Sequence, residues 1–100
     1  MMYIIQLIYI HQGQEEVFHE FESLAIPLME KYNGKLIQRI RPGQAAFIAG
    51  DDEKPYEVHI VSFDSQDDFD RFKQDDTRKQ FLHLKEQSVR SILMVQGTKL

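Results

Sequence analysis

A chain of 100 residues with 42% hydrophobic and 28% charged side chains has the composition of one small globular domain, which we assign to residues 1–100. Its formal net charge of -4 disfavours nucleic acid and anionic membranes as partners, because both are bound through basic surfaces. The absence of cysteine excludes a disulfide framework, a thiolate nucleophile and a cysteine metal site.

The first apolar stretch, Met2–Ile10, could be mistaken for part of a secretory signal. No basic residue precedes it, and no small-residue cleavage site follows it. No stretch approaches the ~20 apolar residues of a membrane span. We therefore expect a cytoplasmic protein.

Met2–Ile10 is predicted to be a central strand, because both of its alternating faces are apolar. One face carries Tyr3, Ile5, Leu7 and Tyr9, and only Gln6 interrupts the other. Such a strand needs cover on both sides of its sheet.

A long helix is predicted from about Gln14 to Tyr32, because its apolar residues fall on one stripe of 3.6-residue period. Pro27 lies inside this pattern and is expected to bend the helix over a curved sheet. Asn33-Gly34 is expected to form its C-terminal cap.

Three further strands and a second helical region complete the pattern. Lys35–Arg41 and Tyr56–Phe63 are predicted strands, Gln44–Ala49 is a candidate continuation of the first of them, and Val89–Gln96 is the last strand. Between these, Ser65 and Asp75 are predicted to cap consecutive helical segments.

The order strand, helix, strand, strand, helix, strand predicts a ferredoxin-like α+β sandwich with antiparallel sheet order 4-1-3-2. Its helices cover one sheet face only. We expect the apolar Tyr3, Ile5, Leu7 and Tyr9 to face the helices, with Val58 and Ile60. The other face would then expose Ile4, Ile8, Ile37, Val61, Ile92 and Met94, a patch that a second copy would cover in a homodimer.

The sequence also resembles the dimeric α+β-barrel superfamily, which includes the antibiotic-biosynthesis monooxygenase-like proteins. It looks most like small bacterial domains of unknown function in that group. The resemblance lies in MYIIQLIYI, AIPLMEKYNGKLI, VSFDSQDDFDRF and SVRSILMVQG. It implies a dimeric barrel, and it suggests cofactor-free monooxygenase- or isomerase-like chemistry.

Sorting the strands by face gives the candidate site. The face assigned to the dimer also carries five polar residues that we predict to bind a ligand: Gln6, Arg39, Glu57, His59 and Arg90. His59, in mid-strand, is the candidate catalytic base. The alternative is a hydrogen-bonded interface histidine. Arg39 and Arg41 could hold an anion or flank the interface as rim charges.

We expect no metal and no cofactor. Glu16 and His19 have the spacing of a carboxylate-histidine metal motif, but no second copy of the motif exists. Phosphate-binding glycine loops are also missing from the sequence.

Two functions remain open. The first is a homodimer that binds a small, partly apolar molecule in its barrel cavity. The second is a non-catalytic dimeric binding or interaction module with a filled interface.

Overall fold

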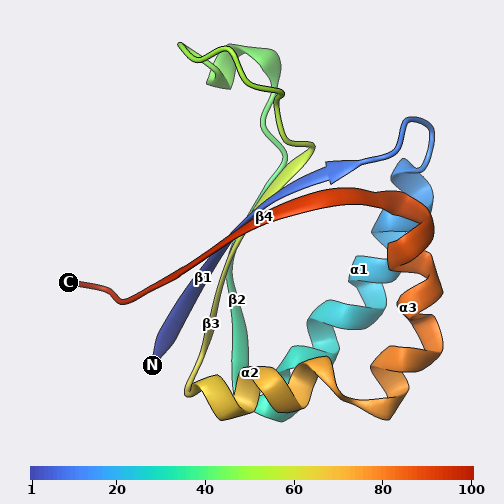
Figure 1. Cartoon of the computed structure of the whole chain (residues 1–100), viewed down its shortest axis with the longest axis vertical. Coiled ribbons are helices and arrows are strands. Elements are labelled where there is room, and N and C mark those ends of the chain that lie inside the picture. Colours follow the sequence, from blue (N-terminus) through green and yellow to red (C-terminus); the bar gives the residue numbers. More distant parts are fainter.

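The computed structural model describes residues 1–100 as an α+β fold with one four-stranded antiparallel sheet in the order β2-β3-β1-β4 (Figure 1). This confirms the predicted topology, which is the same order read from the other edge. The elements are β1 (Met2–Ile10), α1 (Glu15–Met29), η1 (Glu30–Tyr32), β2 (Gly34–Ile40), η2 (Gln44–Ala46), β3 (Glu57–Phe63), α2 (Gln66–Lys73), α3 (Asp76–Ser88) and β4 (Val89–Gly97).

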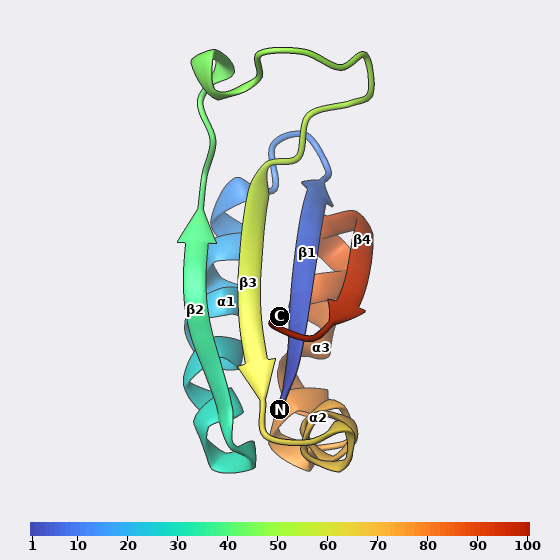
Figure 2. The same ribbon diagram turned by 90° about the vertical axis from the view of Figure 1, so that its left-hand side faces the viewer.

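All three α-helices lie on one face of the sheet, and nothing in the chain covers the other face (Figures 1 and 2). Figure 2 looks directly onto this open face, with the helices behind the strands. None of the helices is both long enough and apolar enough to cross a membrane.

The predicted helix caps are confirmed. The Ser65 side chain accepts a hydrogen bond from the Asp68 N–H, and the Asp75 side chain accepts one from the Arg78 N–H. Each cap satisfies an N–H group that the first helical turn leaves without a partner. Two separate helices result, α2 and α3.

Asn33 and Gly34 join η1 to β2 at a point of close packing. Asn33 adopts the left-handed conformation, with φ of 58°. A Cβ added to Gly34 would lie 2.6 Å from the Phe63 ring and 2.9 Å from both Cβ and the carbonyl oxygen of Met29. Only glycine lets the chain turn this tightly against the core.

We therefore expect Gly34→Ala to destabilise the fold by about 1–3 kcal/mol, the usual cost of overpacking a core. Urea denaturation checks this value. Gly43→Ala is the matched control, because a Cβ at Gly43 would meet nothing within 4 Å. Equal stability of the two variants would contradict the packing role of Gly34.

The predicted continuation of the second strand at Gln44–Ala49 is wrong. Residues 44–46 form the short 3₁₀ helix η2, within a segment that runs from Arg41 to Tyr56 and projects beyond the sheet (Figures 1 and 2). Pro42 lacks the N–H group that a ladder would need, and Gly43 follows it, so the strand ends there.

The predicted assignment of the two sheet faces is also wrong. Ile4, Ile8 and Val61 are buried beneath the helices, whereas Ile5 is 42% exposed on the open face. The same holds for the rest of β1: Tyr3, Leu7 and Tyr9 lie on the open face and are only half-buried. Hydrophobic alternation does not rank two apolar faces, and the face that meets the helices is the one that carries Gln6 and His59.

A bulge in β2 makes the predicted alternation of this strand wrong as well. Leu36 pairs with Val61 but Gln38 pairs with Ile60, so Ile37 is an extra residue in the ladder. Such a bulge shifts the alternation by one residue. Leu36 and Arg39 therefore share the helix-facing side, although simple alternation predicts opposite sides.

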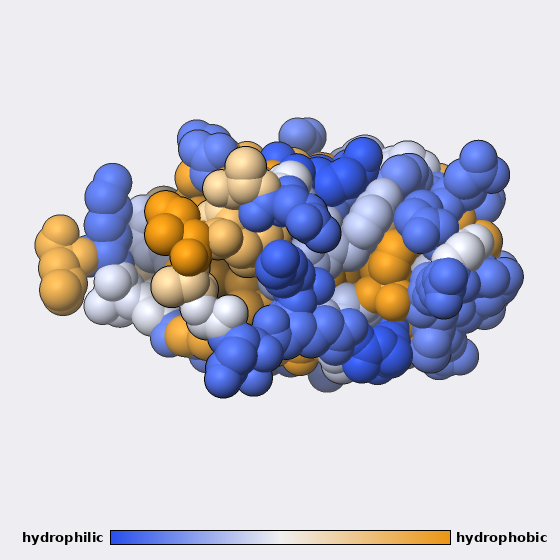
Figure 3. Space-filling view, turned by 90° about the horizontal axis from the view of Figure 1, so that it is seen from above, coloured by the Kyte–Doolittle hydropathy of each residue, from blue (hydrophilic) through white to orange (hydrophobic).

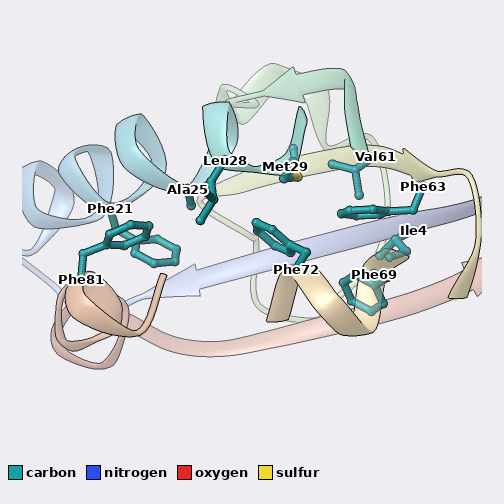
Figure 4. Close-up of a cluster of buried hydrophobic side chains, with 10 residues drawn as sticks. All are labelled: Ile4, Phe21, Ala25, Leu28, Met29, Val61, Phe63, Phe69, Phe72 and Phe81. Carbon is teal, nitrogen blue, oxygen red and sulfur yellow. The ribbon is translucent and has the colours of Figure 1, made fainter. Parts of the chain in front are cut away.

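The core lies between the helices and the sheet, and phenylalanine dominates it (Figure 4). Phe63 of β3 packs against Phe69 and Phe72 of α2, with ring centroids 5.2 and 5.6 Å apart. Phe21 of α1 meets Phe81 of α3 edge to face, at 5.9 Å. These aromatic pairs join all three helices to one another or to the sheet.

The open face of the sheet is strongly apolar. Ile5, Ile37, Leu93 and Val95 are between 38% and 55% exposed there, and Tyr3, Leu7, Val58 and Ile60 lie among them. In the view from the loop end, hydrophobic surface gathers over the projecting segment, and the helix side is mostly hydrophilic (Figure 3). This is an unusual amount of exposed apolar surface for an isolated chain.

Candidate functional site

A cavity of about 70 Å³, which we call the inner cavity, lies between the helices and the covered face of the sheet. Most of its lining is apolar and belongs to the phenylalanine-rich core of Figure 4. Five polar side chains also line it: Gln6, Glu22, His59, Arg78 and Lys85. Apolar walls with a few polar groups are the usual make-up of a small-molecule site.

Glu57 anchors one side of this site. Its carboxylate is fully buried and accepts hydrogen bonds from Arg39 Nε at 2.8 Å, Arg41 Nε at 3.0 Å and His59 Nε2 at 2.8 Å. Burial alone would raise the pKa of Glu57, but these hydrogen bonds from His59, Arg39 and Arg41 outweigh it and lower the pKa to about 2. Glu57 is therefore a carboxylate at any ordinary pH.

The ionised carboxylate of Glu57 determines which ring nitrogen of His59 carries the hydrogen-bonding proton. An ionised carboxylate can only accept, so Nε2 of His59 must carry the proton that it donates to Glu57. In the neutral ring the lone pair then belongs to Nδ1, which has no hydrogen-bond partner in the chain. His59 is 3% exposed and lines the inner cavity, so it is placed as an oriented base.

Glu22 of α1 also lines the cavity. It is 8% exposed, and it makes no hydrogen bond or ion pair with another side chain. Burial raises its pKa, although the nearby His59 and Arg39 pull the pKa down. A carboxyl group held in this way is a candidate proton donor.

Arg78 and Lys85 bring two cationic groups from α3. The Arg78 guanidinium lies over the Phe72 ring, 5.3 Å from its centroid, and Nη1 donates to the Lys73 carbonyl oxygen at 3.3 Å. Burial lowers the pKa of both side chains, and their mutual repulsion adds to the effect at Lys85. Neither side chain has an ion-pair partner within 4.0 Å.

The structure brings four of the five predicted ligand-binding residues together. Gln6 and His59 are paired across β1 and β3, and Arg39 and Glu57 complete the group. Gln6 and His59 line the inner cavity, and Arg39 and Glu57 lie beside them on the same helix-facing side of the sheet. The prediction that this group faces a second subunit is therefore wrong. The cause is the inverted assignment of the sheet faces.

Arg90, the fifth predicted residue, lies elsewhere. Its guanidinium is 5.7 Å from the centroid of the Tyr9 ring, on the open face, and it forms an exposed ion pair with Glu53 of the projecting segment. It does not line the inner cavity.

His19 is a structural partner of the projecting segment. Its Nε2 lies 2.7 Å from the Tyr56 hydroxyl, and the two rings are stacked. No group of three or more His, Cys, Asp or Glu side chains is arranged to hold a metal ion.

Sequence reasoning missed three of the five polar residues that line the cavity. Glu22 lies four residues after Phe18 and three before Ala25, on the buried stripe of α1. Arg78 and Lys85 flank Phe81 at the same spacing in α3. A charged residue inside an apolar helical stripe is the signal that could have identified them.

The comparisons with known proteins establish the fold. No protein-family model and no curated protein matches the sequence. Among solved structures, a protein of unknown function from Rhodopseudomonas palustris matches with a TM-score of 0.86 and 15% identity, over 99% of this chain and 82% of that one. A NIPSNAP family protein with unknown function from Agrobacterium tumefaciens matches with a TM-score of 0.72 and 18% identity, over 97% and 86%.

An antibiotic biosynthesis monooxygenase-like protein from Nitrosomonas europaea also has a similar structure. Its TM-score is 0.75 and its identity 11%, over 100% of this chain and 99% of that one. The resemblance seen in the sequence is therefore confirmed at the level of fold. A fold of this kind carries many functions, so the chemistry has to be argued from the site.

Proposed function

We propose that this chain forms a homodimeric α+β barrel and binds a small, partly apolar molecule in the inner cavity, with His59 as a catalytic base. The observation that carries the proposal is the oriented imidazole of His59, which lines a mostly apolar cavity with Nδ1 unpaired. Gln6, Glu22, Arg39 and Glu57 support the ligand or the base, and no cofactor takes part.

The simplest chemistry for this arrangement is proton transfer. Nδ1 of His59 removes a proton from a carbon next to a carbonyl group, and the Glu22 carboxyl group supplies one at another position. The net reaction is an isomerisation in which no atom is gained or lost. With O₂ as oxidant, the same carbanion would be oxygenated, so that one oxygen atom enters as a carbonyl and the other leaves as water.

The cavity volume limits the size of the ligand. A cavity of ~150 Å³ admits benzene, and typical drug-sized pockets exceed ~300 Å³. The inner cavity, at about 70 Å³, holds a group of a few atoms. A larger ligand would enter with its reactive group only, or after the helices move apart.

The proposal of a dimer rests on the exposed apolar side chains of the open face. Only 19 of the 100 residues are buried within one chain, which leaves the apolar side chains of a whole sheet face uncovered. A second copy placed sheet to sheet would cover Ile5, Leu93 and Val95 with the same residues of its partner. The same surface also supports the alternative function, a non-catalytic interaction module.

Filling the inner cavity separates these two functions. Ala25 is buried in its lining, so Ala25→Leu should abolish the binding of small carbonyl fragments of a few heavy atoms, measured by ligand-observed NMR. Leu24→Met, on the exposed side of the same helix, is the control and should bind normally. If no fragment binds the wild-type chain, or if Ala25→Leu binds as well as wild type, the interaction module is the better account.

His59→Ala should leave the dimer intact and lower proton exchange of the bound fragments by about 10²–10⁴-fold. The readout is the loss of fragment C–H signals in D₂O. His83→Ala is the control, because His83 is exposed on α3. Exchange at the wild-type rate in His59→Ala would remove His59 from the catalytic role.

A further inference from the structure

Two cationic side chains line the inner cavity, and neither has an ion-pair partner. Arg78 and Lys85 both line it, and both come from the inward stripe of α3. Glu22 is the only carboxylate among the lining residues, and it forms an ion pair with neither. The cavity therefore holds two positive groups against at most one negative group.

The Glu57 network cannot supply the missing negative charge. That carboxylate is already shared among Arg39, Arg41 and His59, which use both of its oxygens. It also lies with the sheet, whereas Arg78 and Lys85 belong to the helix layer on the other side of the cavity.

One atom shows where an acceptor is missing. The Nε–H group of Arg78 is fully buried and is the only buried side-chain nitrogen or oxygen in the chain that has no hydrogen-bond partner. A buried donor without an acceptor destabilises the fold, because it has lost its hydrogen bonds to water and gained none in return. The guanidinium stacks on the Phe72 ring, and Nη1 donates to the Lys73 carbonyl oxygen, so neither contact supplies an acceptor for the Nε–H group.

We propose that the inner cavity binds a small organic carboxylate, whose oxygens are held by Arg78 and Lys85 while its short apolar part lies against the phenylalanine-rich walls. The inference rests on the proposed ligand-binding function and names the chemical class of the ligand. Guanidinium and ammonium groups are the usual partners of a carboxylate, and the apolar walls disfavour an inorganic anion such as phosphate.

The test uses propionate, which matches the small cavity, and propionamide, its neutral counterpart of nearly the same shape. Calorimetric titration at constant ionic strength should give propionate at least tenfold tighter binding than propionamide. Inorganic phosphate should bind more weakly than propionate. Equal affinity for propionate and propionamide, or tighter binding of phosphate, would overturn the proposal.

Substitutions in α3 test whether Lys85 supplies the positive charge that binds propionate. Lys85→Met keeps the length of the side chain and should weaken propionate binding at least tenfold while leaving propionamide unchanged. Lys79→Met is the matched control, since Lys79 is exposed on the same helix beside Asp76, and it should bind propionate like wild type. Wild-type propionate affinity in Lys85→Met would overturn the assignment.

The failure of this inference can be told from the failure of the proposed function. If neutral fragments bind the cavity and propionate does not, only the carboxylate assignment falls. If neither class binds the wild-type chain, or if both bind Ala25→Leu as well as wild type, the ligand-binding function falls with it.

Discussion

Glu57→Gln is expected to lower the free energy of unfolding by about 3 kcal/mol at neutral pH. The change keeps the size of the side chain and removes the charge that Arg39, Arg41 and His59 share. A carboxyl pKa that falls from 4.5 to about 2 on folding corresponds to a stabilisation of that size. Chemical denaturation measures the loss.

The low pKa of Glu57 predicts that the free energy of unfolding depends on pH. Because the pKa of Glu57 is lower in the folded chain, its contribution is complete above pH 4.5 and is lost as the pH falls from about 4.5 to about 2. Wild type should therefore lose about 3 kcal/mol more than Glu57→Gln over this interval. The difference between the two proteins isolates Glu57 from the other carboxyl groups.

Glu53→Gln is the matched control, because Glu53 also pairs with an arginine but is 63% exposed. Exposed ion pairs contribute about 0–1 kcal/mol, so this variant should behave almost like wild type. Equal effects of the two substitutions would mean that the buried network does not hold β3 and the end of β2 together.

Ile5→Lys is expected to convert the proposed dimer into monomers. Ile5 lies on the central strand β1, between Ile60 and Val95 on the open face. In a two-fold dimer each copy would bring one unpaired lysine into an apolar interface. Like charges in an interface cost several kcal/mol, so the dimer should weaken by roughly 100-fold or more.

Sedimentation velocity at micromolar concentration measures this effect. Leu24→Lys is the matched control, since Leu24 is 43% exposed on α1, close to the 42% of Ile5, but lies on the helix side. A wild-type chain that is monomeric at these concentrations would contradict the dimer directly. An Ile5→Lys variant that stays dimeric would place the interface on another surface.

The topology could be read from the sequence because its signals are local. Apolar periodicity defines β1 and α1, and the caps at Ser65 and Asp75 define where α2 and α3 begin. Each signal is contained in a short stretch of sequence, as the spacing of apolar residues or as a cap beside the N–H group that it satisfies, so no knowledge of tertiary packing is needed.

The orientation of the sheet could not be read in this way. Whether Gln6 and His59 meet the helices or the open face depends on what the helices offer them, and Glu22 and Lys85 line the cavity with them. The bulge at Ile37 likewise depends on pairing with β3. These are consequences of packing between elements, and alternation within one strand does not contain them.

The sequence therefore predicts the strand residues of the candidate site, apart from Arg90, and assigns them to the wrong side of the sheet. His59, Glu57, Arg39 and Gln6 do form one group, because cross-strand neighbours on one face follow from the register. The partners from α1 and α3 were missed, since a helix adds its residues to a site only after it docks. The cavity beneath the helices thus replaces the expected cavity between subunits.

The location of the ligand site is the central claim, and methyl NMR tests it most directly. Propionate and the bound fragments are titrated into protein labelled at Ile, Leu and Val methyl groups. We expect shifts at Val61, Leu36 and Ile92, which line the inner cavity, and unchanged signals at Ile5 and Leu93 on the open face. Shifts confined to the open-face methyl groups, or no shift at any cavity methyl group, would contradict the account.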